Sequence, residues 1–167
     1  MHPTEIGDSS VGEGAEAAHV NTVLGDRDGP VGTAWATALA TPRPGHSAFV
    51  TVLQPNLPVK PLTLFVNKAP IAGEQHGDLT RGAAQAGVAG GVADAVADGV
   101  IQPEAAEDLL LIASVWVNPA ARNAQLVYEN NRAATRQALE HGEDGTPKVA
   151  DMLAVRHAPA NPFFTLA

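Results

Sequence analysis

The sequence contains no cysteine and few aromatic residues. Without cysteine there is no disulfide, no thiolate nucleophile and no cysteine-ligated zinc or iron–sulfur site. Only 4% of the 167 residues are aromatic, although 45% are hydrophobic. We therefore expect alanine, valine and leucine to fill the interior. A chain of this length is long enough to bury one hydrophobic core.

Clustered positive charge and long apolar runs are also absent. Ten basic residues against 18 acidic ones give a net charge of −8, and no segment gathers Lys or Arg into a patch. Nucleic acids and anionic membranes attract concentrated positive charge, so neither is an expected partner. No run is long enough for a membrane span, and Met1–Gly14 lacks the features of a secretory signal. These observations predict a soluble cytoplasmic protein.

Hydrophobic patterning predicts an α+β fold. Residues 1–10 are polar and are expected to form a flexible tail, which leaves residues 11–167 as one domain. Strands are expected at residues 17–25, 47–53, 62–66 and 108–117, and helices at 30–40, 83–100, 122–140 and 149–155. The strand at 108–117 is the most apolar and is expected to be central. This order of strands and helices along the chain favours a mixed sheet with helices mainly on one face.

Two segments depart from regular patterning. Gly87, Gly90 and Gly91 lie inside the predicted helix 83–100, where each glycine costs up to about 1 kcal/mol relative to alanine. No strand precedes them, as a dinucleotide-binding loop requires, so we interpret them as places of close packing. Residues 55–61 contain three prolines. Because each proline fixes φ and restricts its predecessor, this loop is predicted to be stiff.

His19 is distinguished from the other histidines by its place in a predicted strand. The others are expected to be solvated in loops or terminal segments: His2, His46, His76, His141 and His157. No two histidines have metal-ligand spacing, so no metal site is predicted. Side chains alternate along a strand, so His19 and Asn21 share a face. Spacing alone leaves two interpretations of His19 open: an ordinary satisfied histidine, or an acid–base residue.

Several motifs recur together, in this order, in one enzyme family. They are Val11-Gly12-Glu13-Gly14, Ala18-His19, the segment from Gly25 to Gly32, Pro55-Asn56-Leu57-Pro58, Lys60-Pro61 and the segment from Val92 to Val96. On these motifs, which extend over roughly Val11 to Ala138, the sequence resembles the formaldehyde-activating enzymes. The resemblance implies a homopentamer of α+β subunits similar to the second domain of ribosomal protein S5. It also implies that a pterin binds in clefts between neighbouring subunits.

The resemblance implies a reaction and a set of site residues. The family joins formaldehyde to tetrahydromethanopterin as co-substrate, giving methylene-tetrahydromethanopterin and water without a metal or bound cofactor, as part of one-carbon metabolism and methylotrophy. His19 matches the family's catalytic histidine, while Lys68 and Gln85 match pterin-contacting positions. Three further contact positions carry different residues here: Asn21 for aspartate, Val50 for leucine and Pro70 for threonine.

These departures leave more than one function open. Asn21 lacks a negative charge, Pro70 lacks both a hydroxyl and a backbone donor, and Asn118 replaces a common histidine. The first hypothesis is a condensing lyase in which His19 donates a proton. The second is a non-catalytic paralogue that carries or senses a reduced pterin or formaldehyde adduct. A third is that another small carbonyl or amine substrate occupies the same cleft.

Overall fold

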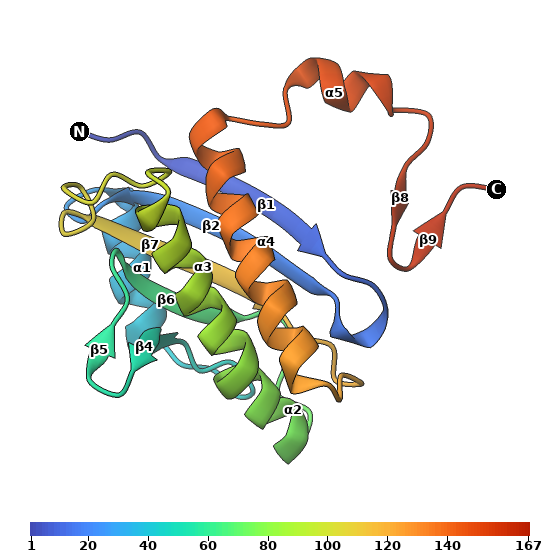
Figure 1. Ribbon diagram of the computed structural model, residues 1–167, viewed down its shortest axis with the longest axis horizontal. Coiled ribbons are helices and arrows are strands. Elements are labelled where there is room, and N and C mark those ends of the chain that lie inside the picture. Colours follow the sequence, from blue (N-terminus) through green and yellow to red (C-terminus); the bar gives the residue numbers. More distant parts are fainter.

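A five-stranded sheet organises the computed structural model, which describes residues 1–167. In spatial order its strands are β1 (Glu5–Val11), β2 (Ala18–Asp26), β7 (Leu109–Trp116), β6 (Leu62–Asn67) and β3 (Phe49–Val50). Neighbouring strands are antiparallel except for β6 and β7, which are parallel. The sheet is therefore mixed, and the strand predicted to be central, β7, is the third of the five (Figure 1).

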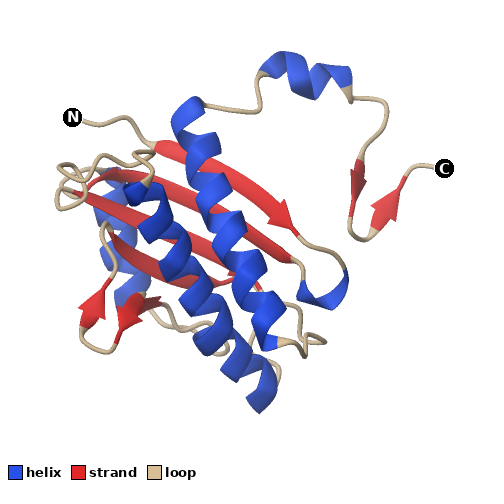
Figure 2. Ribbon diagram, viewed as in Figure 1, coloured by secondary structure: helices blue, strands red, loops and turns tan.

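Helices cover the two faces of the sheet unequally. One face carries α3 (Gln85–Ala97) and α4 (Ala124–Asp144), which cross the strands side by side (Figure 2). A short helix, α2 (Glu74–Leu79), leads through a π-helical turn at Thr80–Ala84 into α3. On the opposite face α1 (Pro30–Ala40) packs near the end of β2. The part of this opposite face that α1 does not cover carries no helix. We call it the open face of the sheet.

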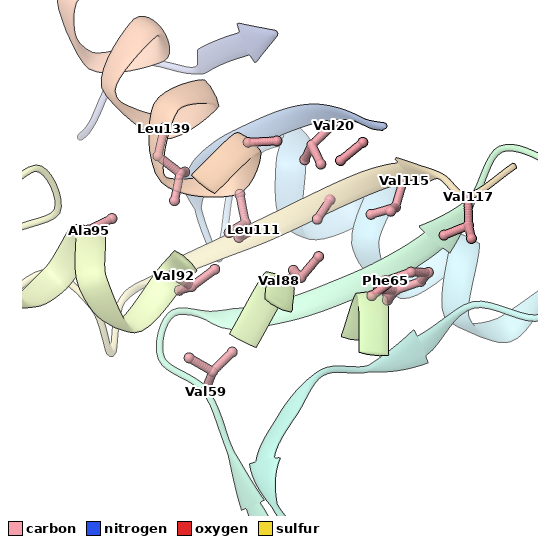
Figure 3. Packing of buried hydrophobic residues seen from close by; sticks show 14 of the residues in the cluster. Val20, Val59, Phe65, Val88, Val92, Ala95, Leu111, Val115, Val117 and Leu139 are labelled. Atoms are coloured by element: carbon pink, nitrogen blue, oxygen red, sulfur yellow. The ribbon is translucent and has the colours of Figure 1, made fainter. Parts of the chain in front are cut away.

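The hydrophobic core lies between the sheet and the helix pair α3–α4. Val88 and Val92 of α3 point toward Leu111 of β7 and Phe65 of β6 (Figure 3), and all four side chains are fully buried. Apart from Phe65, the side chains of this cluster are aliphatic. The core is therefore built from small and branched residues, as the composition predicts.

The expectation of a flexible tail at residues 1–10 is wrong. Glu5–Val11 forms β1, which pairs along its full length with β2. Its inward positions are Gly7 and Ser9 instead of large apolar residues. Gly7 allows the backbone of α4 to approach closely at Ala138. The strand therefore lacks the apolar alternation by which strands are predicted, and its stability comes from the ladder and from α4.

The expectation of one strand at residues 47–53 is also wrong. The segment divides at Thr51 into β3 and a second short strand, β4 (Val52–Gln54), which leaves the main sheet. β4 pairs with β5 (Leu57–Pro58) in a separate hairpin. The predicted stiff loop at 55–61 thus contains β5, and Asn56 turns the chain with a φ of 65°. Asparagine is one of the few residues that tolerate this left-handed conformation.

The chain after α4 forms an extended arm with little contact to the rest of the fold. It contains α5 (Val149–Ala154), predicted from the sequence, and a small hairpin of β8 (Ala160–Asn161) and β9 (Phe164–Thr165). Figure 1 shows the arm leaving the helix end and running outward. Its residues from 149 onward are all exposed, including several large apolar ones. None of the helices has the length and apolar character that crossing a membrane requires.

The glycines within α3 explain how closely α3 and α4 pack. A Cβ added at Gly87 would lie 2.5 Å from the Tyr128 carbonyl oxygen, and one at Gly91 would lie 2.5 Å from the Arg132 carbonyl oxygen. Their interpretation as packing positions is therefore confirmed. Arg132 also bridges the two helices, with Nε and Nη2 each donating to the Asp94 carboxylate at 2.7 Å. This contact lowers the pKa of Asp94.

We predict that Gly91→Ala destabilises the protein. The added methyl group would overlap backbone atoms of α4, and overpacking of this kind typically costs about 1–3 kcal/mol. Urea unfolding at one fixed protein concentration measures the change in the free energy of unfolding. Gly82→Ala is the matched control, because nothing lies within 4 Å of a Cβ there and alanine restricts the unfolded chain. Equal stability of the two variants would contradict this account of the helix pair.

Candidate functional site

Polar side chains from three strands meet on the open face of the sheet. His19 and Asn21 of β2 alternate with the buried Val20 and so point to this face together. In the β1–β2 ladder Asp8 lies directly opposite Asn21. On the other side of β2, Trp116 of β7 lies opposite His19. Directly opposed residues of a ladder share a face, so the register alone brings these side chains together.

The imidazole of His19 bridges a carboxylate and an amine. Its Nε2 lies 2.7 Å from Oδ1 of Asp8, and its Nδ1 lies 3.2 Å from Nζ of Lys68. A carboxylate can only accept a hydrogen bond and an ammonium group can only donate one. Nε2 of the neutral ring therefore carries the proton, and Nδ1 accepts from Lys68.

Asn21 also connects Asp8 and Lys68. Its amide nitrogen donates to Oδ1 of Asp8, and its amide oxygen accepts from Nζ of Lys68. The amide thus satisfies both its donor and its acceptor within the cluster. We refer to Asp8, His19, Asn21 and Lys68 as the His19 cluster. It contains one carboxylate, one amine and an imidazole between them.

Lys68 is partly withdrawn from solvent at the end of β6. Burial lowers the pKa of its ammonium group below the usual value, and the negative charge of Asp8 partly opposes this effect. A lysine with a lowered pKa releases its proton more readily than an exposed one. The cluster therefore holds two nitrogen groups suited to proton exchange, His19 and Lys68, in direct contact.

A cavity of about 750 Å³ opens beside the cluster. His19 and Lys68 line it, together with Trp116 and Asn118 from the end of β7, the loop before β2, and residues 160–163 of the arm. Its size falls in the range of small-molecule sites, and it combines an aromatic wall with a few polar groups. Such a cavity can take a flat heterocyclic ligand and place it against the imidazole.

The residues expected from the family resemblance fall into two groups. His19, Asn21 and Lys68 lie together, as described. Val50, Pro70 and Gln85 do not line the cavity. Gln85 is buried at the start of α3, where its side-chain oxygen accepts a 2.7 Å hydrogen bond from the Val52 amide. Within one copy of the chain, no hydrogen bond joins Gln85 to the His19 cluster.

Asp8 is a site residue that the sequence reasoning missed. It stands in the segment predicted to be a flexible tail, and the pattern of small and polar residues around it resembles a loop. The only available signal was that residues 5–11 can pair with the predicted strand at 17–25 through a short connection. The expectation that His76 is solvated is wrong as well. It is buried in α2, and its Nε2 donates to the Val117 carbonyl at 2.8 Å.

Asn118 is one of the residues that line the cavity. The Asn118 side-chain oxygen accepts from the Ala120 amide at 2.8 Å, so it stabilises a turn at the rim of the cavity. No group of three histidine, cysteine, aspartate or glutamate side chains in the chain is arranged to hold a metal ion. His19 and Lys68 of the cluster offer proton transfer and hydrogen bonding.

Known proteins resemble this chain over most of its length. It is 41% identical over 158 residues to a 5,6,7,8-tetrahydromethanopterin hydro-lyase from Methanosarcina barkeri, covering 95% of this chain and 89% of the relative. It is 43% identical over 148 residues to a bifunctional enzyme Fae/Hps from Methanococcoides burtonii, covering 89% of this chain but only 37% of the relative. A bifunctional enzyme Fae/Hps from Archaeoglobus fulgidus is 39% identical over 158 residues, covering 95% of this chain and 40% of the relative.

The chain thus spans well under half the length of the bifunctional relatives and most of the length of the hydro-lyase. A model of the family described as formaldehyde-activating enzyme (Fae) matches residues 6–164. This match begins within β1, includes the whole His19 cluster and reaches β9. The chain therefore belongs to the formaldehyde-activating enzyme family.

Proposed function

We propose that this protein is a lyase that condenses formaldehyde with tetrahydromethanopterin, forming methylene-tetrahydromethanopterin and water. The observation that carries the proposal is the position of His19, which contacts Lys68 and lines a cavity of suitable size. The hydro-lyase relative, similar over nearly its whole length, supports the same reaction. The protein would act in the cytoplasm, in one-carbon metabolism and formaldehyde assimilation or detoxification.

The difficult step of this reaction is the loss of water. A pterin amine adds to the formaldehyde carbon and gives a carbinolamine, whose hydroxyl group is a poor leaving group. Protonation of that hydroxyl allows the C–O bond to break, and water departs. The second pterin nitrogen then closes the methylene bridge and returns a proton. A positioned acid–base group with a pKa near neutrality suits both proton transfers, and histidine is the usual choice.

His19 is placed to serve as that group through Nδ1. Nε2 is engaged by Asp8, so Nδ1 is the ring nitrogen that exchanges protons on the side of Lys68. Lys68 can supply a proton to Nδ1 directly across 3.2 Å, and its lowered pKa favours that transfer. Holding the pterin and formaldehyde together in the cavity contributes the remaining acceleration by proximity.

We further propose that the complete site forms between copies of the chain, in a homopentamer of subunits resembling the second domain of ribosomal protein S5. Val50, Pro70 and Gln85 would then contact the pterin from a neighbouring subunit, since none of them lines the cavity beside His19 within one copy. The arm supports an oligomer. It exposes several large apolar side chains that its own copy does not cover: Val149, Met152, Leu153, Val155, Phe163, Phe164 and Leu166.

We predict that His19→Ala reduces the initial rate of condensation to the non-enzymatic background. The variant keeps the cavity but has no ring nitrogen to protonate the leaving hydroxyl, and such a group typically contributes a factor of about 10²–10⁴. The rate is followed with tetrahydromethanopterin and formaldehyde against a protein-free control. Sedimentation of the variant should match that of the wild type. Full activity in a correctly assembled variant would rule out His19 as the proton donor.

A carrier or sensor of reduced pterins is the second candidate function, favoured by Asn21, Pro70 and Asn118 at positions where the family usually has other residues. Calorimetric titration with tetrahydromethanopterin, combined with the rate assay, distinguishes the enzyme from the carrier or sensor. Binding without any acceleration of the condensation by the wild-type protein would establish the carrier. Binding accompanied by acceleration establishes the enzyme, and absence of pterin binding would point to another small carbonyl or amine substrate.

We predict that Asn21→Asp does not increase the turnover of formaldehyde. The carboxylate of Asp8 already contacts the His19 ring and the position 21 side chain. A second carboxylate would stand directly opposite the first in the β1–β2 ladder, where like charges destabilise the pairing. Initial rates of the variant and the wild type test this. A tenfold gain would show that Asn21 weakens the enzyme.

We predict that removal of residues 148–167 lowers the number of copies in the assembly. Burial of the arm's apolar side chains by another copy would stabilise the oligomer, and truncation removes all of them. Analytical ultracentrifugation measures the mass, and circular dichroism checks that the helices of the remaining fold persist. Full-length Arg156→Ala is the control, because it removes a charged arm residue and keeps the apolar ones. An unchanged number of copies, calculated from the measured mass and the shorter chain, would assign assembly to other surfaces.

A further inference from the structure

We propose that Asp8 is a positioning residue for His19 and supplies the negative charge of the site from β1. This inference rests on the proposed condensing function. Asp8 carries the one carboxylate of the His19 cluster, and it contacts both polar side chains of β2 that face the site. Its role is to hold the imidazole so that Nδ1 is directed toward Lys68 and the cavity.

The backbone of Asp8 is held firmly from the helix side of the sheet. The Asp8 carbonyl accepts a 2.8 Å hydrogen bond from Nδ1 of His141 in α4. The next residue, Ser9, is buried and donates its hydroxyl to the Gln137 side chain at 2.6 Å. Gly7, the preceding residue, lies against the Ala138 backbone. Figure 1 shows α4 crossing β1 at this part of the sheet. The carboxylate therefore projects to the open face from a fixed base.

The contact determines which ring nitrogen carries the proton. A carboxylate can only accept, so the 2.7 Å contact requires the proton of the neutral ring to be on Nε2. Nδ1 is then the unprotonated ring nitrogen, which accepts a hydrogen bond from Lys68. If an amide replaced the carboxylate, its NH₂ group could also donate to the ring, and the orientation of the imidazole would no longer be fixed.

Asp8 does not serve mainly to stabilise the fold. The side chains of Asp8 and His19 are 61% and 42% exposed, and ion pairs between exposed groups add little stability. Neither Nε2 of His19 nor Asp8 Oδ1 is enclosed by the core. We therefore expect the contact to affect the rate of the reaction. The direction of Nδ1 of His19 decides whether the ring can protonate the hydroxyl group of the carbinolamine.

The test compares Asp8→Asn with Asp78→Asn in the full-length protein. Asp78 is an exposed residue of α2 outside the site, so its replacement makes the same change in charge. Asp8→Asn should lower kcat about tenfold to hundredfold, a part of the usual contribution of an acid–base group. It should leave KM for the pterin within about twofold and the thermal midpoint unchanged. Asp78→Asn should match the wild type, and Asp8→Glu should recover most of the lost rate.

A spectroscopic measurement tests the contact without activity. With ¹⁵N-labelled histidine, the Nε2–H signal of His19 is identified by its absence in His19→Ala. Its proton should resonate at low field in the wild type, as expected for a bond to a carboxylate, and should move or disappear in Asp8→Asn. Asp8→Glu should retain it. The spectra are recorded at mildly alkaline pH, where imidazole rings are ordinarily neutral.

The outcomes separate this inference from the proposed function. An active wild type whose kcat survives Asp8→Asn, or whose Nε2–H signal is unaffected, overturns the role of Asp8 and leaves the condensing function intact. A wild type without acceleration overturns the condensing function, and the role of Asp8 falls with it even if the contact is seen by NMR. If Asp8→Asn unfolds, Asp8→Glu decides the matter, because a folded Asp8→Glu variant with no recovered rate also overturns the inference.

Discussion

The pairing of β1, β2 and β7 is the constraint on which the rest of this structure depends. Along β2, Val20, Thr22 and Leu24 point into the core, while His19 and Asn21 point the other way. A shift of the ladder by one residue would exchange these sets and place the imidazole under α4. Burial of the apolar set therefore fixes the direction of the polar one. The site derives its geometry from the same register that holds the fold together.

Proton chemistry in the His19 cluster depends on the order of three groups. The carboxylate of Asp8, the His19 ring and the amine of Lys68 lie in sequence, with contacts of 2.7 Å and 3.2 Å. A negative group on one side and a proton donor on the other orient the ring. Asn21 fits this arrangement because an amide can donate to the carboxylate and accept from the amine at once. Its lack of charge is thus compatible with a working network.

The site residues expected from the family do not all line one cavity within a single copy of the chain. His19 and Lys68 meet within one copy, while Gln85 is buried at the start of α3, where it accepts from the Val52 amide. The proposed division of the pterin contacts between copies requires a neighbouring subunit beside the cavity. The arm, with exposed side chains such as Phe163 and Leu166, is a segment whose apolar surface also remains uncovered within one copy. Both features are explained together if copies of the chain assemble around the cavity.

The sequence by itself determined the elements whose patterns are strong and local. Alternation marked β2 and placed His19 and Asn21 on one face. The patterning also predicted the helix at residues 30–40, which is α1, and apolar residues marked β7 as central. The tertiary structure alone decided what lies far apart in the chain. Lys68 reaches His19 across 49 residues, and Asp8 reaches it from a strand with no apolar signature. Those contacts arise from strand register and helix packing, which act between segments and leave no periodic pattern in either one.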